Sequence, residues 1–293
     1  MENSFILYSL LILFLPLLAF VIQIFFGKRL PREGDWVSIG AISITLILAI
    51  TMFVKMLLVG DPEFKHEASF VWLDMGAFTI SLGFLVDNIT IIMLLIVALI
   101  STCTHIFSTE YLKGDIRYSR YFGYLGLFTF SMNGIVLANN LMSMYMFWEL
   151  VGVSSYLLIG HWFEKDSAAD ASKKAFLTNR VGDIGFFIGI MLIYSAVGSF
   201  AFTDVFDGVA SGMIAGTTLT FAGVGLFMGA MGKSSQFPLH IWLPDAMEGP
   251  TPVSALMHAA TMVAAGVYLT VRIFPILTPD ALLVVAYVGG FTA

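Results

Sequence analysis

The chain is dominated by long apolar stretches, each close to the roughly 20 residues that an α-helix needs to cross a bilayer. In lipid, every span must satisfy its own backbone hydrogen bonds, and a helix does so within a single segment. The stretches are residues 5–26, 36–59, 82–107, 120–138, 141–162, 174–197, 217–245, 251–273 and 280–293. We therefore predict an all-α, polytopic transmembrane helical bundle of about nine spans.

The first and last stretches bear on how much of a protein this chain represents. Residues 5–26 lack a basic leader and a small-residue cleavage site, so we interpret them as a retained span. The last stretch, 280–293, is short and has no flank. We expect the chain to be a fragment of a longer protein that stops within its ninth helix.

The composition favours an integral membrane protein over a soluble domain. Hydrophobic residues make up 58% of the chain and charged residues 12%, against roughly 45–50% and about 25% in soluble domains. The basic residues are scattered and do not alternate with aromatic ones, so we expect no nucleic-acid partner. The single cysteine, Cys103, excludes an internal disulfide and argues against a zinc or iron–sulfur site.

The basic residues of the loops indicate an orientation. Nine of them fall on one side of the predicted spans, which we call the basic-loop face: Lys28, Arg29, Arg32, Lys113, Arg117, Arg120, Lys165, Lys173 and Lys174. The opposite side holds Lys55, Lys65 and Arg272. By the positive-inside rule, we expect a multi-pass protein of the cell inner (plasma) membrane with its N-terminus outside. On that outer side, apolar and polar residues alternate along 60–81, which predicts a small β-hairpin. Residues 200–209 favour a short amphipathic helix on the same side.

The seventh stretch contains two residues that a membrane helix tolerates poorly. Lys233 lies near its middle, and a lysine at that depth costs a few kcal/mol on insertion scales. Pro238 follows five residues later and removes a backbone hydrogen bond. We predict a helix broken between Gly232 and Pro238, with Ser234 and neighbouring polar residues satisfying the freed backbone groups. Such a break survives only where protein or water surrounds it.

A single acid, Glu149, lies near the middle of the stretch 141–162. An ionisable residue in a membrane span is by default a candidate for function. Glu149 and Lys233 have opposite charges at similar depth, so we predict that they face each other across the bundle and transfer protons. The alternative is a static structural ion pair, which would not explain the helix break beside Lys233.

A second acid, Asp183, lies one to three turns inside the basic-loop face. Arg180 precedes it by three residues, which makes the two helical neighbours. One interpretation is a salt-bridged helix end. The other is that Asp183 tunes Lys233 or lies on its water path.

The histidines complete the set of candidate proton carriers, because histidine titrates near neutral pH. His258 follows the broken helix and His240 lies just after the break, so both are candidates for a relay. His105 and His161 lie near the ends of their stretches, and we expect them at the membrane interface. We find no phosphate-binding, nucleophile-elbow or dinucleotide motif. We expect no cofactor and no metal site in this chain.

Three segments together resemble one family. The run WLPDAMEGPTPVSALMH at 242–258, the run FWELVGVSSY at 147–156 and the run NRVGDIGF at 179–186 resemble the antiporter-like membrane subunits of respiratory complex I. The resemblance covers nearly the whole chain and is nearest to the subunit L, or chain 5, type. The large subunit of Mrp-type cation/proton antiporters shares the PTPVSA core. Ala264, together with Asp245, Glu248 and Gly249, favours the complex I type.

The resemblance implies two inverted five-helix repeats, each with a broken helix. It implies a lysine on the first broken helix, a glutamate on an earlier helix and a histidine on the eighth helix. These positions correspond to Lys233, Glu149 and His258. On this basis we divide the chain into N-terminal helices with an outer loop (1–110), the first repeat as a proton half-channel (111–275) and a truncated ninth helix (276–293). The family's second half-channel lies beyond this chain.

The implied function is proton translocation in NADH:quinone oxidoreductase, with other membrane-arm subunits and the bilayer as partners. NADH, FMN, iron–sulfur clusters and quinone would then belong to partner subunits. The alternatives are an Mrp-type antiporter subunit, and a membrane subunit of a related hydrogenase or inorganic-carbon uptake complex. A purely structural membrane subunit would not need Glu149 and Lys233 to titrate.

Overall fold

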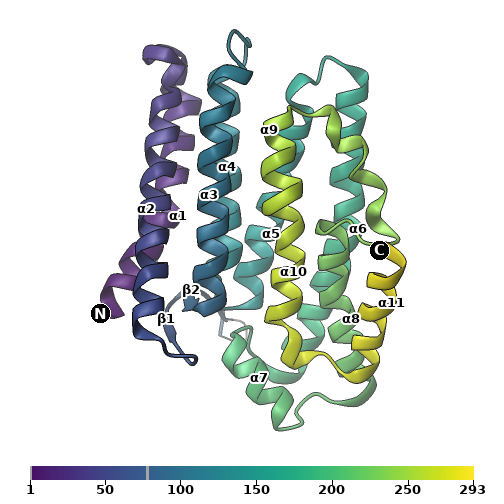
Figure 1. The fold of residues 1–293 in the computed structure, drawn as a ribbon. Coiled ribbons are helices and arrows are strands. Elements are labelled where there is room, and N and C mark those ends of the chain that lie inside the picture. The colour runs from purple at the N-terminus through teal and green to yellow at the C-terminus, as the bar shows by residue number, and fades with distance from the viewer. Residues whose placement is uncertain (1, 77–78) are drawn as a thin grey trace.

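The computed structural model describes residues 2–76 and 79–293, and it is an upright bundle of long helices (Figure 1). Within these described residues, six helical segments are long and apolar enough to cross a membrane by length and composition: Ser4–Arg29, Pro31–Val59, Asn88–Tyr111, Leu141–Trp162, Asp166–Val197 and Thr251–Arg272. The helices are α1 (Glu2–Phe26), α2 (Asp35–Val59), α3 (Asn88–Tyr111), α4 (Tyr118–Leu137), α5 (Leu141–Ile159), α6 (Asp166–Val197), α7 (Phe202–Ala210), α8 (Gly216–Lys233), α9 (Thr251–Ser254), α10 (Met262–Arg272) and α11 (Pro279–Thr292).

The three basic loops share one face of the bundle. In Figure 1 the connections α1–α2, α3–α4 and α5–α6 all lie at the top, while the strands and α7 lie at the bottom. α4 packs against α1, α3 and α5, and most of its side chains are buried. Its small and polar residues, such as Ser131 and Asn133, explain why α4 is not among the strongly apolar helices. The all-helical membrane bundle is therefore confirmed, with short strands added to it.

The predicted hairpin on the opposite face is confirmed, and it is longer than we expected. Strand β1 (Lys65–Asp74) pairs antiparallel with β2 (Thr79–Asp87). The third helix then begins only at Asn88, so our start for that span at residue 82 was wrong. The reason is local, because the Asp87 side chain accepts a hydrogen bond from the Thr90 backbone N–H and caps α3. The predicted amphipathic helix is also present, as α7.

The break in the seventh stretch is confirmed. α8 ends at Lys233, and Ser235 takes a left-handed backbone conformation with φ 52°. The freed backbone groups are satisfied partly as predicted, since the Ser235 hydroxyl donates to the His240 carbonyl at 3.1 Å. The indole of Trp242 donates to the Gly232 carbonyl at 3.0 Å, while the Ser234 hydroxyl donates to Val263 of the next helix. Short 3-10 turns, Leu239–Trp242 and Asp245–Glu248, follow the break.

The eighth stretch is not one uniform helix. A π-helical turn, Ala255–Ala260, separates α9 from α10. The Thr261 hydroxyl donates to the Leu256 carbonyl at 2.6 Å, five residues earlier, and so stabilises the widened turn. This π turn places His258 beside the broken helix.

Glycines bring α6 and α8 into close contact. A Cβ atom on Gly182 would lie 2.6 Å from the Met228 carbonyl oxygen, and one on Gly189 would lie 2.6 Å from the Leu226 nitrogen. Such small residues let the backbones of membrane helices approach each other. The residue after Gly182 is Asp183, so this contact positions an acid beside the end of α8.

Candidate functional site

Lys233 and Asp183 form an ion pair inside the bundle. The Lys233 ammonium nitrogen lies 3.5 Å from the Asp183 carboxylate, and the two side chains are 1% and 2% exposed. Lys233 is the last residue of α8, so the break leaves its side chain at the interrupted end of a helix. Two buried charges are tolerated only when they are paired or further hydrogen-bonded. The break, the close α6–α8 packing and the pair therefore form one arrangement.

Trp148 holds the other oxygen of Asp183. Its indole nitrogen donates to Asp183 Oδ1 at 2.9 Å, and its ring packs edge-on against Phe186. Trp148 is fully buried and directly precedes Glu149 on α5. We did not expect Trp148 at the site from the sequence. The only signal was its place next to the acid, because an indole N–H in an apolar core needs an acceptor.

Glu149 and Lys233, which we predicted to face each other, each form an ion pair with a residue of α6. Glu149 pairs with Arg180 of α6, while Lys233 pairs with Asp183 of the same helix. Arg180 is therefore not the helix-end partner of Asp183. The long guanidinium side chain of Arg180 reaches across to α5, and this leaves the neighbouring carboxylate for α8.

Glu149 nevertheless lies close to the lysine. A Cβ atom on Gly152 would lie 2.8 Å from the Lys233 ammonium nitrogen. Gly152 is three residues after Glu149, which places both on one face of α5. Within about one turn, α5 thus carries Trp148, Glu149 and Gly152, and the missing side chain of Gly152 leaves space for the Lys233 ammonium group.

Several buried polar atoms around Lys233 have no hydrogen-bond partner among the described residues. They include Lys233 Nζ, Asn179 Oδ1, Gln236 Oε1 and His258 Nε2. Asn179 Oδ1 lies 3.6 Å from the Cβ position of Gly232, beside the lysine. Buried polar groups are normally satisfied by protein or by ordered water. The surroundings of Lys233 are therefore suited to internal water.

The two histidine candidates have different positions. His258 lies 3.2 Å from the Ser254 hydroxyl, and its ring packs edge-on against Trp242. Trp242 in turn bonds the carbonyl next to Lys233, so His258 is one side chain away from the lysine site. His240 is exposed and stacks on Phe237, away from the ion pair. The structure brings His258 towards the site and does not bring His240.

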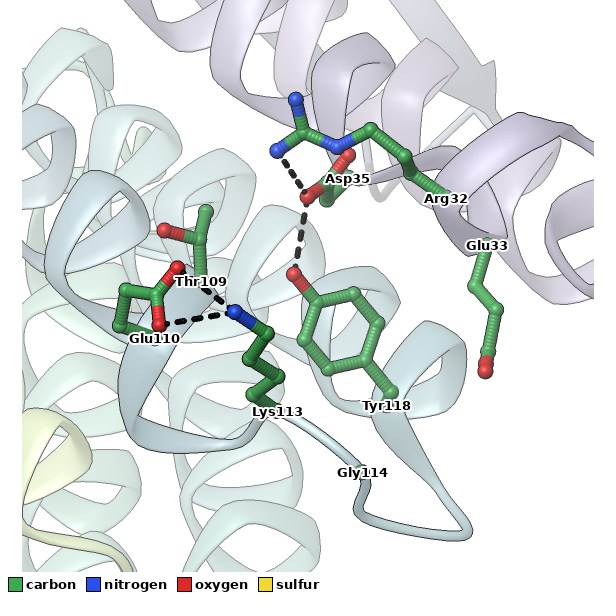
Figure 2. Close-up of a pocket in the computed structure, with 8 residues that line it drawn as sticks. All are labelled: Arg32, Glu33, Asp35, Thr109, Glu110, Lys113, Gly114 and Tyr118. Carbon is green, nitrogen blue, oxygen red and sulfur yellow. Dashed lines mark hydrogen bonds and ion pairs between the residues drawn. The ribbon is translucent and has the colours of Figure 1, made fainter.

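A separate charged cavity of about 420 Å³ opens at the basic-loop face (Figure 2). Asp35 accepts hydrogen bonds there from Arg32 at 2.8 Å and from the Tyr118 hydroxyl at 2.9 Å. Lys113 pairs with Glu110 at 3.2 Å. These charged side chains pair with one another at the ends of α1–α4 and do not contact the Lys233–Asp183 pair. Among the described residues, no group of three or more potential metal ligands occurs.

Two family models match parts of this chain. Residues 138–293 match the family described as NADH:quinone oxidoreductase/Mrp antiporter, TM. Residues 72–122 match the family described as NADH-Ubiquinone oxidoreductase (complex I), chain 5 N-terminus. The first match spans the helices that carry Glu149, Asp183, Lys233 and His258.

Two curated relatives cover nearly all of this chain. The chloroplastic NAD(P)H-quinone oxidoreductase subunit 5 of Cryptomeria japonica is 43% identical over 98% of this chain and 40% of its own length. The F(420)H(2) dehydrogenase subunit L of Methanosarcina mazei is 43% identical over 98% of this chain and 45% of its own. The chain therefore spans less than half the length of these relatives.

Solved structures show the same fold. In the Mrp complex from Dietzia sp., a chain superposes with a TM-score of 0.77 and 26% identity, covering 90% of this chain and 28% of that one. A chain of the membrane-bound sulfane sulfur reductase, an archaeal respiratory complex, gives a TM-score of 0.79 at 20% identity, covering 92% and 53%. Taken with the sequence matches, this multi-pass membrane protein belongs to the NADH:quinone oxidoreductase/Mrp antiporter family of membrane subunits, in its chain 5 type.

Proposed function

We propose that this chain is a proton-translocating membrane subunit of an NADH:quinone oxidoreductase. One observation carries the proposal, namely the buried Lys233–Asp183 pair at a helix break. A buried ammonium group held at 3.5 Å, with no hydrogen-bond partner for its nitrogen among the described residues, is neither strongly held nor exposed. Such a group can lose its proton when its compensating charge changes.

The residues suggest how a proton could be loaded and released. Lys233 lies between Asp183, which compensates its charge, and the α5 turn that holds Glu149. If Glu149 leaves Arg180, its carboxylate offers a second site for the ammonium group. Trp148 keeps Asp183 oriented while Lys233 changes partner. His258 receives or returns the proton through water. His240 would act only at the exposed end of this route.

The surroundings of the chain follow from the same proposal. Other membrane-arm subunits and the lipid bilayer are its partners. NADH, FMN, iron–sulfur clusters and quinone belong to partner subunits, so redox chemistry elsewhere drives the proton steps. We place the chain in the cell inner (plasma) membrane with its N-terminus outside. The division at residues 110 and 275 into N-terminal helices, half-channel and a last helix is part of this proposal.

The test is Lys233→Met in the assembled complex, with proton uptake measured in membrane vesicles beside the amount of complex. Methionine keeps the apolar stem and removes the charge. We expect uptake to be lost and assembly to be retained, because Asp183 can take up a proton and still accept the Trp148 hydrogen bond. Lys113→Met, at a 73% exposed lysine, is the matched control and should leave both quantities unchanged.

The other outcomes are equally informative. Normal uptake by the assembled Lys233→Met complex would remove Lys233 from the mechanism. Loss of assembly would instead identify Lys233–Asp183 as a static pair, since breaking a buried pair costs about 3–5 kcal/mol.

The similarity to the Mrp complex supports a second candidate function, cation/proton exchange. The two candidates differ in their dependence on sodium. Redox-driven uptake that is insensitive to sodium supports the first, whereas proton movement that requires a sodium gradient supports the second.

A further inference from the structure

Two histidines that take no part in the proposed Lys233 site are buried. His105 of α3 is 0% exposed and His161, after the end of α5, is 3% exposed. Our expectation that both lie at the membrane interface stays a prediction. Their stretches do end nearby, but α4 packs against both α3 and α5 at that level and covers the two rings. A buried imidazole needs partners for both ring nitrogens.

The bonding of His105 leaves one nitrogen open. Its Nδ1 lies 2.7 Å from the Ser101 carbonyl oxygen, which can only accept, so Nδ1 carries the hydrogen. Nε2 is then an acceptor, and it has no partner among the described residues. Leaving such a buried acceptor without a hydrogen bond destabilises the fold. An internal water at Nε2 would remove that cost.

Further proton-carrying groups lead from His105 to the basic-loop face. Ser108 is one turn along α3, and its hydroxyl lies 3.2 Å from the Tyr121 hydroxyl of α4. The Tyr121 ring packs edge-on against His161, with ring centroids 5.3 Å apart. His161 Nε2 lies 3.3 Å from Asp115, whose side chain is 15% exposed and so reaches the surface. We call His161, Tyr121, Ser108 and His105 the hydroxyl–histidine file.

The inner end of the file lies at the depth of His258. α3 runs beside the segment from α9 to α10, because the hydroxyls of Tyr111 and Thr251 are 3.1 Å apart. The packing of α3 against the π turn continues this contact. His105 precedes Tyr111 by six residues and His258 follows Thr251 by seven. At a rise of about 1.5 Å per residue, the two histidines are therefore level in the bundle.

We propose that the hydroxyl–histidine file is a second proton-carrying route, which takes protons from Asp115 at the basic-loop face and binds an internal water at His105 Nε2. This inference rests on the proposed function, because a route needs a transported proton. Each hydroxyl accepts one proton and donates its own, and each imidazole binds and releases one proton. No bond other than O–H and N–H changes, and water bridges the steps where protein groups do not touch.

The first experiment interrupts the file at two of its groups. His105→Asn keeps the bond to the Ser101 carbonyl, because Asn179 makes the same bond to the carbonyl four residues before it at 2.8 Å. Tyr121→Phe keeps the ring and removes the hydroxyl. His66→Asn, on β1, is the matched control for the histidine change. Proton uptake by vesicles and the thermal stability of the assembled complex are measured together.

We expect uptake to fall at least about tenfold in His105→Asn and in Tyr121→Phe, as general acid–base groups typically contribute this much or more. Stability and the His66→Asn control should stay at the parent value. Unchanged uptake in both file variants would overturn the route.

The second experiment detects the proposed water at His105 Nε2 directly and does not depend on proton transport. In the complex labelled with ¹⁵N-histidine, magnetisation transfer from water to imidazole nitrogen is recorded, and the His105 signal is assigned by its loss in His105→Asn. We expect transfer from water to His105; its absence would overturn the water site. Normal proton uptake by the Lys233→Met complex would contradict the proposed function and leave the water signal at His105 unaffected. Failure of the proposed function can therefore be distinguished from failure of the water site.

Discussion

Two buried cation–carboxylate pairs in this molecule differ in how firmly they are held. Lys233 meets Asp183 at a single contact of 3.5 Å, and its nitrogen has no hydrogen bond within the described residues. Arg272, at the opposite face from the basic loops, bonds both oxygens of Asp87 through two nitrogens. Its NH2 group also donates to Thr90 at 3.0 Å and to Tyr268 at 2.7 Å.

The difference supports our proposal, in which the Arg272 pair is structural and the Lys233 pair carries the proton steps. An arginine stays protonated in proteins and presents fixed donors to a carboxylate. The Tyr268 hydroxyl passes this network on to the Val136 carbonyl at 2.7 Å, so it ties α10 to α3, α4 and the hairpin. Lysine shifts its proton affinity readily when buried. In the proposed function, the Arg272 pair therefore fixes the arrangement of helices within which Lys233 changes its partner.

The largest effect on stability should come from Arg272→Met. The change leaves Asp87 half-buried without its cation and removes the donors to Thr90 and Tyr268, so we expect a loss of about 3–5 kcal/mol. Thermal unfolding of the purified complex measures it, beside Lys233→Met. The comparison fails if Lys233→Met destabilises the complex as much as Arg272→Met does.

A smaller effect is expected from Trp148→Phe. The ring contact with Phe186 is kept, while the hydrogen bond to Asp183 is lost. A hydrogen bond to a charged group contributes about 1.5–3 kcal/mol. We expect a modest fall in stability and a clear fall in proton uptake, because Asp183 loses its orientation. Phe186→Leu, which changes the same contact from the other side, is the control and should reduce stability with little effect on uptake. Equal losses of uptake in the two variants would contradict a positioning role for Trp148.

The smallest effect concerns acid pH at the Arg272 pair. Burial alone would raise the pKa of the Asp87 carboxyl, but hydrogen bonds and the charge of Arg272 outweigh it and hold the pKa below its ordinary value. The pair therefore stabilises the fold at neutral pH, above the unfolded-state pKa of about 3.9. This contribution is lost as the pH falls through the lower folded-state pKa. The thermal unfolding midpoint should fall as the pH is lowered from 7 in the parent chain. The fall should be smaller in Asp87→Asn, which has no carboxyl group to protonate at that position.

Much of the fold follows from local sequence properties. Stretch length and hydrophobicity predicted the spans, because a helix in lipid satisfies its own backbone. The break after Lys233 was predictable because proline lacks an N–H and the polar residues before it can bond freed groups. The hairpin and α7 also followed from alternation and amphipathic spacing. The start of the third helix was not predictable from hydrophobicity, because the apolar residues before Asp87 pair as a strand.

The partners of the charged residues were decided only by the tertiary structure. The sequence supplied Glu149, Asp183 and Lys233 and their approximate depth, but depth does not say which helices touch. Glycine contacts bring α6 against α8, so Asp183 forms its ion pair with Lys233. Arg180 of α6 instead pairs with Glu149 of α5. Likewise, His105 and His161 looked interfacial by position along the chain, and only the packing of α4 buries them. Position along one helix is a property of sequence, whereas pairing and burial depend on neighbours brought in from elsewhere in the chain.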